Sequence, residues 1–181
     1  MLKFFQVNRD IFLRTLCLVA VTLFFTSAGA SQGEIILAVN TLLMQLFTLF
    51  SYVMDGFAYA GEALSGRYIG AHNREAFTDT VRHLFGWGAV MAVLFTLTYA
   101  LGGNAFLGLL TDDKEVIAVA DTYFYWALAV PAVGIAAFIW DGIFIGATAT
   151  RGMLLSMTAA AVSFFVLYYG LHPVLANHAL W

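Results

Sequence analysis

Three carboxylates lie inside long apolar stretches of the sequence. Asp55 and Glu62 lie about two helical turns apart in the stretch 34–71, and Asp141 lies in the stretch 113–147. A carboxylate at bilayer depth costs on the order of 2.5–3.5 kcal/mol on insertion scales, so it normally faces a bundle interior or a water-filled cavity. In such a place it can take up H⁺ or Na⁺ facing one side of a membrane and release it facing the other. The three residues are therefore candidates for cation coupling.

The stretch 34–71 contains no proline and carries a polar stripe when it is drawn as a helix. At 1.5 Å per residue it extends ~55 Å, more than a hydrocarbon core of ~30 Å. At ~100° per residue, its polar residues fall within one arc of roughly 100°, and these are Thr41, Thr48, Tyr52, Asp55, Tyr59 and Glu62. The candidates for lining a cavity on or beside this face are Asn40, Gln45, Thr48, Tyr52 and Tyr59. For Asn40, Gln45 and Thr48 the alternative, which we favour, is that they bond to neighbouring helices, at roughly 0.6 kcal/mol per bond.

The acids also have a structural interpretation. Arg14 lies near the start of the first apolar stretch, on the side of the membrane where the two acid-bearing stretches end. Counted from those ends, Glu62 lies ~14 Å and Asp141 ~9 Å along the helix axis, whereas Asp55 lies ~24 Å away and nearer the midplane. Arg14 is therefore predicted to pair with Glu62 or Asp141 in a polar network. The structural interpretation is favoured for Glu62, and both interpretations stay open for Asp55 and Asp141.

Composition indicates an integral membrane protein. Of the 181 residues, 62% are hydrophobic and 10% are charged, against about 25% charged in a soluble domain. Cys17 is the single cysteine, which excludes a disulfide framework, and the four histidines lack metal-ligand spacing. No basic run indicates a nucleic-acid partner. Neither HExxH nor GxSxG occurs, so we expect no enzyme, no catalytic residue, no metal site and no cofactor.

The pattern predicts an all-α, polytopic membrane helix bundle. Its five predicted helices are 10–30, 34–71, 75–101, 113–147 and 152–170. The basic N-terminus followed by an apolar run also matches a secretory signal peptide. A retained first helix is favoured, because Arg14 interrupts the apolar run and further spans follow.

Several residues are predicted to set the helix ends. Asn8 is the predicted N-cap of the first helix. The Gly-Gly-Asn run 102–104 is predicted to break the third helix, and Asp112 is predicted to open the fourth with a capping box. Pro131 is predicted to kink the fourth. The fifth is predicted to end before a His-Pro pair, with 174–181 approaching a further helix.

Basic residues predict the orientation. Seven of the eight Lys and Arg residues fall at the N-terminus, after the second predicted helix or after the fourth. Only Lys114 falls on the other side, among acids. The positive-inside rule therefore places the N-terminus in the cytoplasm.

Three segments carry a resemblance to a known family. They are 51–66, SYVMDGFAYAGEALSG, with the loop GAHNR at 70–74; 8–16, NRDIFLRTL; and 138–148, FIWDGIFIGAT. The chain resembles MATE (multidrug and toxic compound extrusion) transporters, in particular their DNA-damage-inducible F branch. The resemblance covers essentially the whole chain and maps it onto helices seven to eleven of twelve, five of the six helices of the C-terminal lobe.

The resemblance implies a function. It implies part of a cation-coupled antiporter, driven by H⁺ or Na⁺, that exports amphipathic drugs or toxic small molecules by alternating access. It further implies a multi-pass protein of the bacterial cytoplasmic (inner) membrane. The partners are then the lipid bilayer, the amphipathic substrate, and the missing N-terminal lobe and final helix.

The resemblance also bears on the site. Other branches pair two acids, one on each of the helices that match 10–30 and 113–147, which favours Asp141. Here the first helix has no carboxylate after Asp10, so the pair is incomplete unless Asp55 substitutes. Two alternatives remain: a transport-incompetent membrane fragment with a structural role, and a lobe similar to a flippase of lipid-linked sugars. Flippase cavities tend to be basic, whereas the inferred interior here is acidic.

Overall fold

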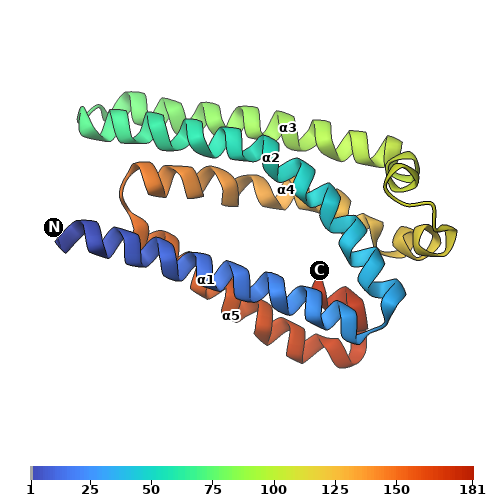
Figure 1. The fold of residues 1–181 in the computed structure, drawn as a ribbon. Coiled ribbons are helices and arrows are strands. Elements are labelled where there is room, and N and C mark those ends of the chain that lie inside the picture. The colour runs from blue at the N-terminus through green and yellow to red at the C-terminus, as the bar shows by residue number, and fades with distance from the viewer. Residues whose placement is uncertain (1) are drawn as a thin grey trace. The chain divides into compact units, whose positions relative to one another are not determined.

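A computed structural model of the chain describes residues 2–181, with side chains for 5–103 and 105–181. Within residues 2–181 there are five long helices and a short terminal 3₁₀ helix (Figure 1). They are α1 (Leu2–Ser31), α2 (Glu34–Gly70), α3 (Arg74–Leu110), α4 (Lys114–Gly146), α5 (Thr150–Leu175) and η1 (Ala176–Leu180). Each long helix contains a segment long and apolar enough to cross a membrane. The all-α membrane bundle is confirmed.

The first helix begins earlier than predicted. α1 starts at Leu2, so Asn8 lies inside it, and the prediction of an N-cap at Asn8 is wrong. No proline or glycine stands between Leu2 and Asp10, so nothing in the backbone stops the helix from extending toward the terminus.

The predicted break after residue 101 is also wrong. α3 continues through Gly102 and Gly103 to Leu110, and the Thr111 N–H donates to the Leu107 carbonyl at 3.0 Å. Gly103 is used for packing, since a Cβ there would lie 2.5 Å from the Phe124 ring of α4. The absence of a side chain lets the two helices approach, so the glycine serves a helix contact.

The start of α4 lies one position from the predicted cap. Asp113, and not Asp112, is the N-cap, and its carboxylate accepts from the N–H groups of Glu115 and Val116 at 2.9 and 3.3 Å. This satisfies two of the N–H groups that have no partner inside the helix. Pro131 lies inside α4 as predicted and is buried.

The C-terminal segment forms a short 3₁₀ helix after α5. α5 passes through Pro173 and ends where Ala176 takes a positive φ of 47°. Residues 176–180 form η1, and Trp181 packs edge-to-face on Phe25 of α1, with ring centroids 5.2 Å apart. The predicted fifth helix, 152–170, is therefore too short, and the residues after it cover the end of α1.

The chain forms two compact units. The first, called the α1–α5 unit, comprises residues 2–41 and Ala149–Trp181. In it α1 and α5 lie side by side (Figure 1), and Phe24 packs edge-to-face on Tyr168 at 4.9 Å. Near the start of both helices, the buried Asp10 carboxylate accepts from the Thr150 hydroxyl at 3.2 Å.

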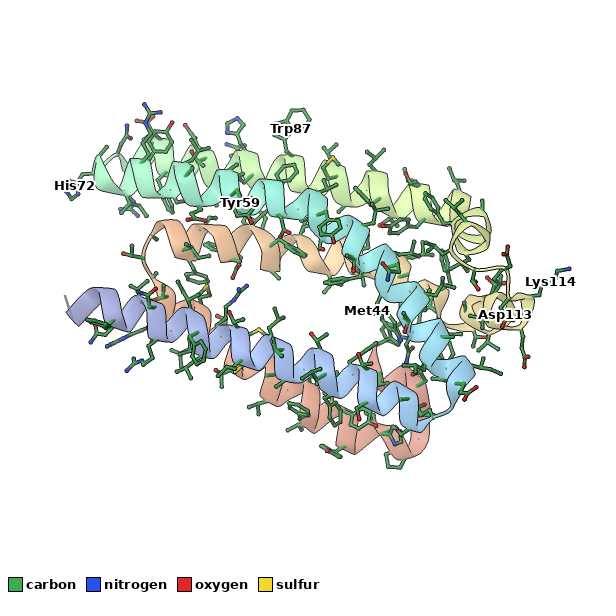
Figure 2. The ribbon with its side chains drawn as sticks, in the orientation of Figure 1. Met44, Tyr59, His72, Trp87, Asp113 and Lys114 are labelled. Carbon is green, nitrogen blue, oxygen red and sulfur yellow. The ribbon has the colours of Figure 1, made fainter. Side chains whose placement is uncertain are left out.

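The second, called the α2–α4 unit, comprises Leu42–Thr148. Its core is built from apolar side chains of all three helices, namely Phe50, Met54, Leu84, Ile139 and Ile143. The buried Tyr99 hydroxyl of α3 donates to the Leu46 carbonyl of α2 at 2.7 Å. Figure 2 shows His72 at one end of this unit and Asp113 with Lys114 at the other.

This arrangement makes the orientation testable. We predict that a cysteine at Ala71 is modified only from the cytoplasm and one at Asp112 only from outside. The reason is that the basic residues cluster at the His72 end of the unit. Both positions are exposed. The measurement is labelling of intact and permeabilised cells with a membrane-impermeant maleimide. Modification of Ala71→Cys in intact cells would show that the chain is inserted the other way.

Candidate functional site

The candidate site is built on a close contact between α2 and α4. Gly142 and Gly146 of α4 lie directly against the α2 backbone, because a Cβ at Gly142 would be 2.8 Å from the Ala58 Cα and one at Gly146 would be 2.9 Å from the Glu62 Cα. Small residues four apart allow such backbone approach in membrane helices. Ala58 pairs with Gly142 and Glu62 with Gly146, so the two helices run parallel.

This register corrects the predicted depths of the acids. Gly142 lies level with Ala58, so Asp141, one residue earlier, lies level with Phe57, about 3 Å along the axis from Asp55 and about 7.5 Å from Glu62. The prediction that Asp141 shares a level with Glu62, with Asp55 nearer the midplane, is therefore wrong. The expectation failed because depths were counted from the helix ends, whereas α2 continues about 12 Å beyond the point where Gly146 ends α4.

The three carboxylates are half-buried. Among the side chains that the structure describes, Asp55 and Glu62 have no ion-pair partner and no hydrogen-bond partner. Beside Asp141, the Trp140 ring packs on Phe85 of α3 at 5.8 Å. The α2–α4 contact thus brings three acids on two helices within about two turns of helix along the axis, in largely apolar surroundings.

The predicted polar stripe of α2 is partly open. Gln45, Tyr52 and Tyr59 recur every seven residues and are exposed, the two tyrosines by 71% and 70%. Residues seven apart share one helix face. Thr48 is half-buried, and its hydroxyl donates to the Met44 carbonyl at 2.8 Å, so its own helix satisfies it. The exposed face therefore consists of two phenol rings and an amide.

Asn40 does not line a cavity. It is 2% exposed and exchanges two amide hydrogen bonds with Asn177, at 2.8 and 2.9 Å, while the Trp181 indole N–H donates to the Asn40 Oδ1 at 3.0 Å. Gly29 of α1 leaves the space for this amide, since a Cβ there would lie 2.9 Å from the Asn40 Nδ2. The cluster joins α1, α2 and the C-terminal segment, which agrees with the favoured interpretation that Asn40 bonds to neighbouring elements and does not line a cavity.

Sequence reasoning missed a buried acid. Asp10 is 1% exposed, and besides Thr150 it accepts from the Arg9 guanidinium at 3.0 Å. It was not among the candidate acids, although its place as the third residue of the motif-bearing segment 8–16 was a usable signal. Arg14 follows one turn later on α1 and is half-buried. Its pairing with Glu62 or Asp141 stays a prediction.

Comparison with known proteins identifies the family. The MatE family model matches residues 11–172. DNA damage-inducible protein F of Escherichia coli (strain K12) is 40% identical over 179 residues, which cover 99% of this chain and 39% of that protein. Two Arabidopsis thaliana proteins are each 24% identical. The match to Protein DETOXIFICATION 45, chloroplastic, covers 74% of this chain and 24% of that protein. The match to Protein DETOXIFICATION 42 covers 81% of this chain and 29% of that protein.

No solved structure matches the chain. The chain spans about two fifths of the length of the Escherichia coli relative and less of the two plant proteins. The family model matches most of the chain, so the chain belongs to the MatE family of multidrug and toxic compound extrusion transporters.

Proposed function

We propose that these helices form part of a cation-coupled antiporter that exports amphipathic small molecules by alternating access. Membership of a transporter family supports export. The observation that carries the coupling step is the pair of half-buried carboxylates on α2, Asp55 and Glu62, which have no partner among the described side chains and lie beside Asp141 of α4.

The physical argument for coupling rests on charge. A carboxylate in apolar surroundings is costly while it is ionised and unpaired. Binding of H⁺ or Na⁺ removes most of that cost, so the cation stabilises whichever conformation encloses the acids most fully. A ligand shifts a conformational equilibrium only by its differential affinity for the two states. An acid that is enclosed in one state and hydrated in the other meets that requirement.

The exposed face of α2 supports an amphipathic substrate. Tyr52 and Tyr59 offer aromatic faces, and a cation within about 6 Å of a ring centroid gains roughly 0.5–2 kcal/mol. The acids Asp55 and Glu62 flank these rings along the same helix. An amphipathic organic cation could therefore place its ring system on the tyrosines and compete with H⁺ or Na⁺ for the acids, which is the basis of exchange.

Vesicle transport tests this function. Inside-out membrane vesicles would be prepared from cells that express the complete reading frame encoding these residues, and loading with a fluorescent cationic dye would be followed. We expect accumulation to be driven by an imposed H⁺ or Na⁺ gradient and abolished by the ionophore that collapses it. Vesicles without the protein are the control. Dye movement that is equal with and without every cation gradient would refute coupling.

A further inference from the structure

The α2–α3 hairpin carries a second site that the transport proposal does not use. A groove of about 420 Å³ runs between the two helices. Its apolar part is lined by Phe57, Leu64, Leu84 and Trp87, and its polar part includes Tyr68, Asp79 and His83. A neighbouring hollow of about 580 Å³ shares Asp79, His83 and Trp87 and adds Arg82. We call this joint surface the α2–α3 groove.

The position of the α2–α3 groove along α3 matches a membrane boundary. The helix from Leu84 to Gly103 is about 28 Å long, close to the hydrocarbon thickness of about 30 Å. Its outward side chains include Val90, Val93 and Leu97, each more than half exposed, and no charged residue occurs there. The charged residues of the groove lie within about one and a half turns beyond Leu84, at headgroup level.

Trp87 marks the same boundary. Its ring is 62% exposed and points away from α4 (Figure 2). Tryptophan is enriched where one side of the ring meets hydrocarbon and the other meets headgroups. An acyl chain that lies along this ring and Leu84 therefore continues directly into the apolar part of the groove.

The polar part presents opposite charges side by side. Asp79 and Arg82 are one turn apart and exposed, and within residues 5–103 and 105–181 neither side chain has an ion-pair partner. The His83 Nδ1 contacts the Asp79 carbonyl at 2.7 Å. A carbonyl only accepts, so Nδ1 carries the proton, and the other edge of the imidazole ring is left to face a ligand.

We propose that the α2–α3 groove binds a phospholipid with a phosphoethanolamine headgroup. The phosphate lies on the Arg82 guanidinium and the primary ammonium on the Asp79 carboxylate, with an acyl chain along Leu84 and Trp87. Side chains at i and i+3 lie about 5–6 Å apart on a helix, which suits two charges joined by a two-carbon linker. Choline has no N–H to donate to Asp79, and glycerol supplies no cation, so both headgroups fit less well.

Native mass spectrometry of the purified chain tests the lipid class. The detergent-solubilised protein would be titrated with phosphatidylethanolamine, phosphatidylcholine and phosphatidylglycerol carrying identical acyl chains. We expect phosphatidylethanolamine to bind most tightly. Asp79→Asn should weaken that lipid about tenfold, or ~1.4 kcal/mol, and remove its advantage over phosphatidylcholine. Arg82→Gln should weaken all three, because each has a phosphate.

Matched substitutions at the other end of the unit are the controls. Glu115→Gln and Lys114→Gln remove one acid and one base at exposed positions of α4 and should leave lipid binding unchanged. Circular dichroism would establish that each variant keeps its helix content. Equal binding of the three lipids by the unmodified chain, preference for phosphatidylglycerol, or a preference for phosphatidylethanolamine that survives Asp79→Asn would each overturn the proposal.

Discussion

Replacing Asp141 by asparagine in the complete reading frame is expected to reduce cation-driven export about tenfold or more. The amount of the variant protein in the membrane should change far less. The substitution keeps the size of the side chain and removes the charge, and hydrogen bonds and contacts to a charged group are worth about 1.5–3 kcal/mol. The measurement is dye efflux in cells, normalised to the protein detected in isolated membranes. Export at the unmodified level would assign Asp141 a structural role.

Two further variants would identify the second member of the cation site. The α2–α4 register places Asp141 between Asp55 and Glu62, about 3 Å along the axis from the first and about 7.5 Å from the second, so Asp55→Asn and Glu62→Gln should be measured in parallel. The partner is the residue whose loss reproduces the Asp141→Asn defect. Glu115→Gln, an exposed acid in the first turn of α4, is the control and should export normally. If neither α2 variant lowers export, the acids of α2 do not couple cations.

Adding one methyl group at Gly142 is expected to destabilise the α2–α4 unit severely. An alanine Cβ there would overlap the Ala58 backbone of α2, and the backbone of a helix cannot move aside as a side chain can. Overpacking typically costs about 1–3 kcal/mol and more where backbone must shift. Gly146→Ala should behave alike, because its Cβ would overlap the Glu62 backbone. The measurement is thermal unfolding of the purified chain in detergent.

Two other helical glycines provide matched controls. Gly56 of α2 and Gly86 of α3 have no atom within 4 Å of an added Cβ. Alanine at either position should be neutral or stabilising, since alanine favours a helix by up to about 1 kcal/mol over glycine. Equal melting temperatures for Gly142→Ala and Gly56→Ala would contradict the close α2–α4 contact.

The sequence by itself determined the class of fold. In a bilayer the backbone must satisfy its own hydrogen bonds, so five long apolar stretches can become only helices, and their number and order followed from hydropathy. The helix ends were less predictable. Gly102 and Gly103 indicate a break by local propensity, yet α3 continues because Gly103 fits against Phe124 of α4. Tertiary packing overrode the local preference.

The partners of the polar residues were decided by the tertiary structure alone. Asn40 was placed on the polar side of its helix correctly, but its bonds to Asn177 and Trp181 join residues more than 130 positions apart. Periodicity assigns a residue to a face and carries no information on what meets that face. The same holds for Asp10 and Thr150. The level of Asp141 beside α2 depends on where Gly142 meets Ala58, because steric fit between backbones sets the register of two helices and the positions of their ends do not.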